Sequence, residues 1–164
     1  MLYLFHDVVY YQFLFARAIR ELIQKDIKLV HAVAKNTKGR TPLHIACQCG
    51  HLEVVKVMDL SSKTLLDATD ADCNTPLHLA CEGGQVGVVE LLISHGANVT
   101  AQNNRGELPV HIAAQHESVE IIKQFMDKED CTFVEYKDKR GYTPLHHAAE
   151  KNQTSIITYL HDQW

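Results

Sequence analysis

The four prolines of this chain all occur in the same short context, and their spacing is regular. Successive prolines are separated by 34, 33 and 35 residues. Each is followed by Leu or Val and then by His, as in Pro42-Leu43-His44, Pro76-Leu77-His78, Pro109-Val110-His111 and Pro144-Leu145-His146. Self-similarity at a fixed period of about 20–50 residues is the mark of a solenoid, in which each unit buries its apolar face against the next. The spacing therefore predicts a single domain of stacked repeats.

The residues around each proline recur as well, and together they predict a turn followed by two helices. An Asp or Asn six residues before the proline suits a tight turn, as does a Gly three before it, which Cys73 replaces in one repeat. Thr before Pro is a good helix N-cap, and Pro is tolerated at the first helical position. Two small residues after the His allow neighbouring helices to approach closely, and a later apolar pair belongs to a second helix behind the first. These features are Asn36, Asp70, Asn103 and Asp138; Ala46-Cys47, Ala80-Cys81, Ala113-Ala114 and Ala148-Ala149; and Val54-Val55, Val88-Val89, Ile121-Ile122 and Ile156-Ile157.

This pattern resembles the ankyrin repeat, which has a period of about 33 residues and a Thr-Pro-Leu-His-x-Ala signature. The resemblance covers residues 36–164. It implies an all-α solenoid of helix-turn-helix units joined by β-turn fingers. The expected repeats are 36–69, 70–102, 103–137 and 138–164, preceded by a degenerate N-terminal capping repeat at 1–35.

Departures from the pattern locate expected irregularities. Leu108 replaces the capping Thr in the third repeat, which removes a hydroxyl cap worth about 1 kcal/mol. Gly50 and Gly84 are expected to end helices in the left-handed conformation, whereas Glu117 and Asn152 stand at the equivalent positions later. Residues 61–66 and 129–134 replace the Gly-Ala turn found at residues 96–97.

Both ends of the chain leave alternatives open. Twelve of the first fifteen residues are apolar or aromatic. This segment has neither the basic start of a signal peptide nor the length of a membrane span. It is expected to be a helix buried on the first repeat, a surface for self-association or for a preceding segment, or an artificial start of the chain. The last helix fits either the end of the array or a piece of a longer one.

The composition excludes other functional classes. The net charge of −4 shows no basic excess for nucleic acid, and five cysteines without paired spacing do not form a secreted disulfide framework. The motif histidines recur once per repeat, so they predict a ladder of hydrogen bonds rather than a metal site. No metal, cofactor or catalytic motif is recognised. We therefore expect an intracellular, cytoplasmic protein that is not an enzyme and does not insert into a membrane.

The resemblance implies that a partner protein binds a concave face made from the finger tips and the inner helices. Charge varies along this face, and Arg40, Asp72, Arg105, Arg140 and Tyr142 are expected to carry specificity. The positions that the family exposes there correspond to Lys38, Arg40, Gln48, Cys49, Asp72, Asn74, Glu82, Arg105, Glu107, Gln115, His116, Lys139, Arg140, Tyr142, Glu150 and Lys151.

A second interpretation keeps the fold but moves the activity elsewhere. The chain would then be a cytosolic array from a larger protein, such as a transient-receptor-potential ankyrin channel or a kinase with ankyrin repeats. The irregular turns of this chain are compatible with such arrays.

Overall fold

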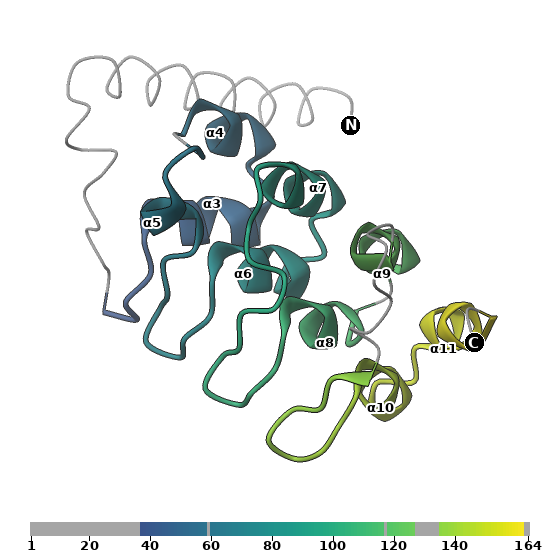
Figure 1. Ribbon diagram of the computed structural model, residues 1–164. Helices are drawn as coiled ribbons and strands as arrows, with labels where there is room; N and C mark the ends of the chain where they lie inside the picture. Colours follow the sequence, from purple (N-terminus) through teal and green to yellow (C-terminus); the bar gives the residue numbers. More distant parts are fainter. Residues whose placement is uncertain (1–36, 59, 117, 127–134, 163–164) are drawn as a thin grey trace, which may run out of the picture.

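The computed structural model describes residues 37–58, 60–116, 118–126 and 135–162. This part of the chain is helical and contains no β-strand. Two layers of helices form a stack, with the fingers on the side of the inner layer that faces away from the outer one (Figure 1). The inner helices are α3 (Pro42–Cys49), α6 (Pro76–Glu82), α8 (Pro109–Ala113) and α10 (Pro144–Glu150). The outer helices are α4 (Leu52–Val57), α7 (Val86–Ser94), α9 (Val119–Met126) and α11 (Thr154–Asp162).

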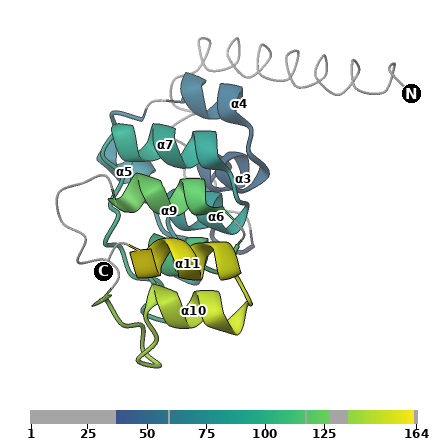
Figure 2. The same ribbon diagram turned by 90° about the vertical axis from the view of Figure 1, so that its right-hand side faces the viewer.

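The order of packing confirms the predicted solenoid. Inner helix packs on inner helix in the order α3, α6, α8, α10, and each also packs on the outer helix of its own repeat. Figure 2 shows α7, α9 and α11 lying one above another with similar orientation. The predicted cap at 1–35, the segment 1–15, the loop 129–134 and Glu117 lie outside the described residues.

Each inner helix begins as the sequence predicts. Thr41 is the N-cap of α3, its hydroxyl accepts the His44 N–H, and its own N–H donates to His44 Nδ1 at 3.1 Å. In the third repeat Leu108 provides no hydroxyl, as predicted, yet its N–H still donates to His111 Nδ1 at 3.1 Å. The histidine therefore preserves half of the cap where the threonine is missing.

The core lies between the two layers and between successive repeats. The small residues Cys47, Cys81 and Ala114 are fully buried between inner helices, which explains why larger residues are not found there. Leu43, Leu77 and Val110, which follow the motif prolines, are also fully buried, whereas Leu145 at the same position of the last repeat is 39% exposed. Burial of this position therefore requires a following repeat.

The irregular segment after α4 contains a further short helix. This helix, α5 (Lys63–Leu66), buries Leu65 and Leu66 against the core. The replacement of the Gly-Ala turn thus adds apolar contacts instead of only lengthening a loop.

The four β-turn fingers precede the inner helices and comprise residues 37–40, 70–74, 103–107 and 138–142. Main-chain hydrogen bonds join them to one another. The N–H of Ala71 donates to Lys38 O, and that of Asn104 donates to Asp72 O, both at 2.9 Å. The N–H of Lys139 donates to Arg105 O at 3.0 Å. Successive fingers are therefore held at a constant spacing, and so are the side chains that they display.

We predict that Gly83→Ala destabilises the protein by about 1–3 kcal/mol, because a side chain there overpacks the interface between α3 and α6. A Cβ on Gly83 would lie 2.2 Å from the Gln48 carbonyl oxygen, which belongs to the main chain and cannot rotate away. The control is Gly87→Ala within α7, where the nearest atom would lie at 3.6 Å. It should stabilise the protein by about 0.5–1 kcal/mol, since Gly is a poor helix former. Urea unfolding measures both, and equal stabilities would contradict the prediction.

A second prediction concerns Cys73, which replaces a turn glycine and has φ +60°. This conformation costs an L-residue about 1–2 kcal/mol, so Cys73→Gly should raise the free energy of unfolding. The gain is smaller than that cost, because glycine gives the unfolded chain more conformational entropy. Cys73→Ala removes the thiol but keeps the strain, and should give no comparable gain. A melting temperature raised as much by Ala as by Gly would show that the thiol, not the backbone, is responsible.

Candidate functional site

The motif histidines form the predicted ladder of hydrogen bonds between repeats. The Nδ1 of each buried ring accepts a main-chain N–H of its own repeat, so the ring proton lies on Nε2. His44 Nε2 then donates to Asn74 O at 3.0 Å, and His78 Nε2 donates to Glu107 O at 3.0 Å. His111 Nε2 donates to Tyr136 O at 2.9 Å. These three histidines thus hold the fingers in place and are not free to act as metal ligands.

Burial also keeps these rings neutral. Desolvation lowers the pKa of His44 and His111, and it lowers the pKa of His78 to about 4. Burial raises the pKa of the Cys47 and Cys81 thiols, so neither is a reactive thiolate near neutral pH. The chemistry-bearing residues of the motif are therefore part of the core.

The expected binding residues lie on the fingers and at the carboxyl ends of the inner helices. We call this surface the finger face; it comprises residues 37–40, 48–49, 71–74, 82–83, 104–107, 115–116, 139–142 and 150–151. Half-buried residues of the expected set are Arg40, Gln48, Asn74, Gln115, His116 and Tyr142. Exposed residues are Lys38, Cys49, Asp72, Glu82, Arg105, Lys139, Arg140, Glu150 and Lys151.

The expectation that Glu107 is exposed is wrong. This residue is only 2% exposed. Its Oε2 accepts hydrogen bonds from Asn103 Nδ2 at 2.9 Å and from Arg105 Nε at 2.8 Å. Because both donors belong to its own finger, the carboxylate turns inward and Arg105 covers it. Glu107 orders the finger and does not face a partner.

The first half of the finger face is joined by a chain of polar contacts. Arg40 Nε lies 3.2 Å from Asp70 Oδ2, and Arg40 Nη1 donates to Gln48 Oε1 at 2.9 Å. Gln48 Nε2 in turn donates to Glu82 Oε2 at 2.9 Å. The Arg40 side chain is only 14% exposed, so its charge is largely engaged within the protein.

The second half is organised around a buried histidine that the sequence did not indicate as functional. His147 Nε2 lies 3.0 Å from Asp138 Oδ2 and 4.0 Å from Glu107 Oε1, and its Nδ1 lies 3.2 Å from Gln115 Nε2. The corresponding residues of the other repeats are Ile45, Leu79 and Ile112, which are apolar. A polar residue at a position that is apolar in the other three repeats was the signal that could have drawn attention to it.

Arg140 lies above this histidine network. Its Nε is 3.4 Å from Asp138 Oδ2, its Nη2 is 3.6 Å from Glu150 Oε2, and its Cζ lies 4.2 Å from the centre of the Tyr142 ring. Asp138 Oδ1 also accepts the main-chain N–H groups of Arg140 and Tyr142, both at 2.8 Å. These hydrogen bonds lower the pKa of Asp138 against the opposing effect of its burial.

The structure brings one group of potential metal ligands together within the described residues. Atoms of Glu107, Asp138 and His147 lie within 4.8 Å of one another. Arg105 and Arg140 lie against the two carboxylates, and the histidine lies between them. Charge pairing and hydrogen bonds therefore account for the arrangement as a polar network beneath the finger face.

Repeated helix pairs, linked fingers and a histidine ladder together define an α-solenoid built for display of surface side chains. The family model for ankyrin repeats in three copies matches residues 6–103, 59–134 and 97–163, and the chain belongs to the ankyrin repeat family. This family is generally non-catalytic, and its repeats are a general protein–protein interaction module.

Known proteins from distant sources are similar to the chain. A Saccharomyces cerevisiae protein with the name "Probable 26S proteasome regulatory subunit p28" is 38% identical over 127 residues, which are 77% of this chain and 55% of that protein. An ankyrin repeat protein of Rickettsia felis is 33% identical over 86% of this chain and 36% of its own length. A tyrosine-protein kinase of Hydra vulgaris is 26% identical over 87% of this chain and 19% of its own. The chain thus spans about half or less of these relatives.

No helix in the described residues is both long enough and apolar enough to cross a membrane.

We predict that the free energy of unfolding falls as the pH is lowered from about 6.5 to about 4. The pKa of His78 is about 4 in the folded protein, against 6.5 for an ordinary histidine. Between these values the unfolded chain binds more protons, so acid favours unfolding, by up to about 3 kcal/mol from this group. His44 and His111 act in the same direction.

Urea unfolding at a series of pH values measures this effect. His78→Gln should show a weaker dependence on pH, whereas His161→Gln should match the wild type, because the side chain of His161 is 86% exposed. Identical pH dependence in the wild type and His78→Gln would exclude the buried ring as the cause.

Proposed function

We propose that this chain is a non-catalytic module that binds a partner protein in the concave groove formed by its finger face. The observation that carries this proposal is the hydrogen-bonded ribbon of fingers, in which Ala71, Asn104 and Lys139 each donate to the preceding finger. A surface held in place before binding loses little conformational entropy on association. The exposed charged residues of the expected set supply the groups that a partner would recognise.

Charge along the finger face supports recognition of one partner in one orientation. The second finger and its helix expose Asp72 and Glu82, whereas the fourth finger exposes Lys139 and Arg140. A partner with the opposite order of charges fits in one direction only, and like charges oppose the reverse. Tyr142 beside Arg140 is the strongest candidate for a large single contribution, because Tyr and Arg dominate binding energies at interfaces.

The similarity to p28 suggests one kind of partner. That relative is named as a regulatory subunit of the 26S proteasome, and it is 38% identical over 127 residues. A role as a subunit or adaptor of a multiprotein complex is therefore the form of binding that we favour. A cytoplasmic location fits this role, and the free cysteines Cys47, Cys49, Cys73 and Cys81 suit a reducing compartment.

A second candidate is that this array serves a larger protein. The chain covers only 19% of the Hydra kinase that it matches. In that case the array binds a partner, and the activity lies in another part of the polypeptide. The finger face would have the same role in that case, so the experiment below applies to both candidates.

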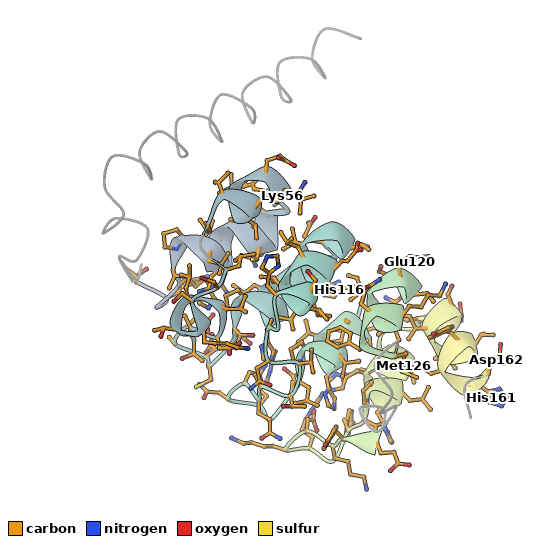
Figure 3. The ribbon with its side chains drawn as sticks, turned by 45° about the horizontal axis from the view of Figure 1, so that its top comes forward. Lys56, His116, Glu120, Met126, His161 and Asp162 are labelled. Atoms are coloured by element: carbon orange, nitrogen blue, oxygen red, sulfur yellow. The ribbon has the colours of Figure 1, made fainter. Side chains whose placement is uncertain are left out.

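Affinity capture from extracts of the source cells tests the proposal. One bait carries Asp72→Lys and Glu82→Lys, a second carries Arg105→Glu and Arg140→Glu, and a control carries Lys56→Glu and Lys123→Glu. The control residues belong to the outer helices α4 and α9, and Figure 3 shows Lys56 far from the fingers. Circular dichroism verifies that all three baits are folded.

We expect a partner that the wild type and the control capture and that at least one finger-face bait loses. Retention of every specific partner by both finger-face baits would contradict the proposal and assign binding to another surface. Proteasome subunits among the lost proteins would support the role suggested by p28.

A further inference from the structure

Burial separates positive from negative charge on the third and fourth fingers. Each of these fingers begins with a short polar residue whose side-chain oxygen accepts two main-chain N–H groups of the same finger. Asn103 Oδ1 accepts those of Arg105 and Glu107. Asp138 Oδ1 accepts those of Arg140 and Tyr142. The Glu107 side chain is 3% exposed and that of Asp138 is 0% exposed. In contrast, the side chains of Arg105 and Arg140 are 71% and 50% exposed. The carboxylates therefore lie inside and the guanidinium groups outside.

Each of these arginines is anchored through one nitrogen. Arg105 Nε donates to Glu107 Oε2 at 2.8 Å, and Arg140 Nε lies 3.4 Å from Asp138 Oδ2. No hydrogen bond or ion pair engages Nη1 or Nη2 of Arg105 in the described part of the chain, and Arg140 makes one long contact, from Nη2 to Glu150 at 3.6 Å. The two terminal nitrogens of a guanidinium form a fork that matches the two oxygens of a carboxylate or the oxygens of a phosphate.

The anchors also limit the motion of the two guanidinium groups. The Tyr142 ring lies 4.2 Å from Arg140 Cζ, so the guanidinium rests on an aromatic surface. Beneath the two anchoring carboxylates lies His147, 3.0 Å from Asp138 Oδ2 and 4.0 Å from Glu107 Oε1. Arginine loses much rotamer freedom when it binds, and partial ordering beforehand reduces that cost.

The first two fingers lack this arrangement. On the first finger, Arg40 is 14% exposed and uses both Nε and Nη1 within the protein, so Lys38 is the exposed cation there. The second finger exposes Asp72 and has no cation. The fourth finger adds exposed Lys139, whose Nζ donates to Asn104 O at 2.8 Å, and Lys137 precedes it. The exposed acids nearby are Glu135 and Glu150. Exposed positive charge is thus concentrated on the third and fourth fingers.

We infer that the third and fourth fingers form a site for an acidic segment of a partner protein, in which Arg105 and Arg140 each bind an anionic side chain through their terminal nitrogens. The acidic groups are carboxylates or phosphoserines, which share the oxygen geometry that this fork recognises. Tyr142 orients Arg140, and the Glu107–His147–Asp138 network supports both arginines from below. This inference rests on the proposed function, because it identifies the chemical group that the third and fourth fingers recognise on a partner.

Fluorescence anisotropy with short labelled peptides tests the site directly. The probes are a peptide of alternating glutamate and serine, the same length of alternating phosphoserine and alanine, and a lysine–serine control, each measured at low and at physiological salt. Binding of either acidic probe by the wild type, without binding of the lysine probe, is expected. Failure of both acidic probes to bind even at low salt would overturn the inference.

Two charge-matched variants separate a local site from the overall field of the protein. Arg105→Glu with Arg140→Glu and Lys56→Glu with Lys123→Glu change the net charge equally. The first should weaken acidic-peptide binding by about tenfold or more, because it removes the charged hydrogen bonds of both guanidinium groups and places two like charges against the peptide. The second should have little effect, and equal weakening by both would overturn the inference.

A third variant tests the geometry of the fork. Arg105→Lys with Arg140→Lys keeps the charge but removes the paired terminal nitrogens, so binding should weaken by less than in the Glu variant but measurably. Tighter binding of the phosphoserine probe than of the glutamate probe would identify phosphate as the preferred group, and the reverse would identify carboxylate. One combination of results separates this site from the proposed function. If the Asp72→Lys and Glu82→Lys bait loses a partner while the arginine variants bind the acidic peptides as the wild type does, the proposed function is retained and this site is rejected.

Discussion

The hydrogen bond from each buried motif histidine to a carbonyl of the next repeat is the contact on which the rest of this structure depends. Its direction is set within one repeat, because a main-chain N–H at the helix start occupies Nδ1 and leaves the proton on Nε2. Its length is set between repeats, at 3.0 Å for both His44 and His78. The histidine ring is buried, so breaking the bond leaves a polar ring nitrogen without a partner in the core. The finger that provides the carbonyl is thereby fixed relative to the helix behind it.

Fixed fingers explain why a chain with short helices can display an ordered surface. Arg105 and Arg140 each follow a residue whose main-chain N–H donates to the preceding finger. These donors are Asn104, which bonds to Asp72 O, and Lys139, which bonds to Arg105 O. The orientation of the two arginine side chains is then refined by buried groups of opposite charge. Pairing of this kind also places Glu107 under the surface, although the residues at the same position of the other repeats, Arg40, Asn74 and Tyr142, are only half-buried. Stability and display are therefore connected through the same hydrogen bonds.

Most of the fold could be predicted from the sequence because its signals are local and repeated. A cap residue, a proline at the first helical position and a left-handed stop depend on neighbours within a few residues, and Thr41, Pro42 and Gly50 have the predicted roles. Even the exceptions followed local rules: Cys73 has φ +60° where a glycine was expected, and Asn152 has φ +57° at a helix stop. The resemblance to ankyrin repeats was confirmed for the same reason, since four copies of one local pattern leave little freedom for another fold.

The sequence by itself determined the repeat unit, the stacking order and the set of positions that make up the finger face. Tertiary structure alone decided which of those positions face outward, because that depends on partners distant in the chain. The carboxylate of Glu107 accepts hydrogen bonds within its own finger and lies 4.0 Å from His147 of the next repeat. The guanidinium of Arg40 pairs with Asp70 of the next repeat, 3.2 Å away. His147 became the centre of a polar network because Asp138 and Glu107 approach it from two different repeats. Periodicity specifies which face of a helix a residue occupies, whereas the charge that remains exposed depends on pairing across repeats.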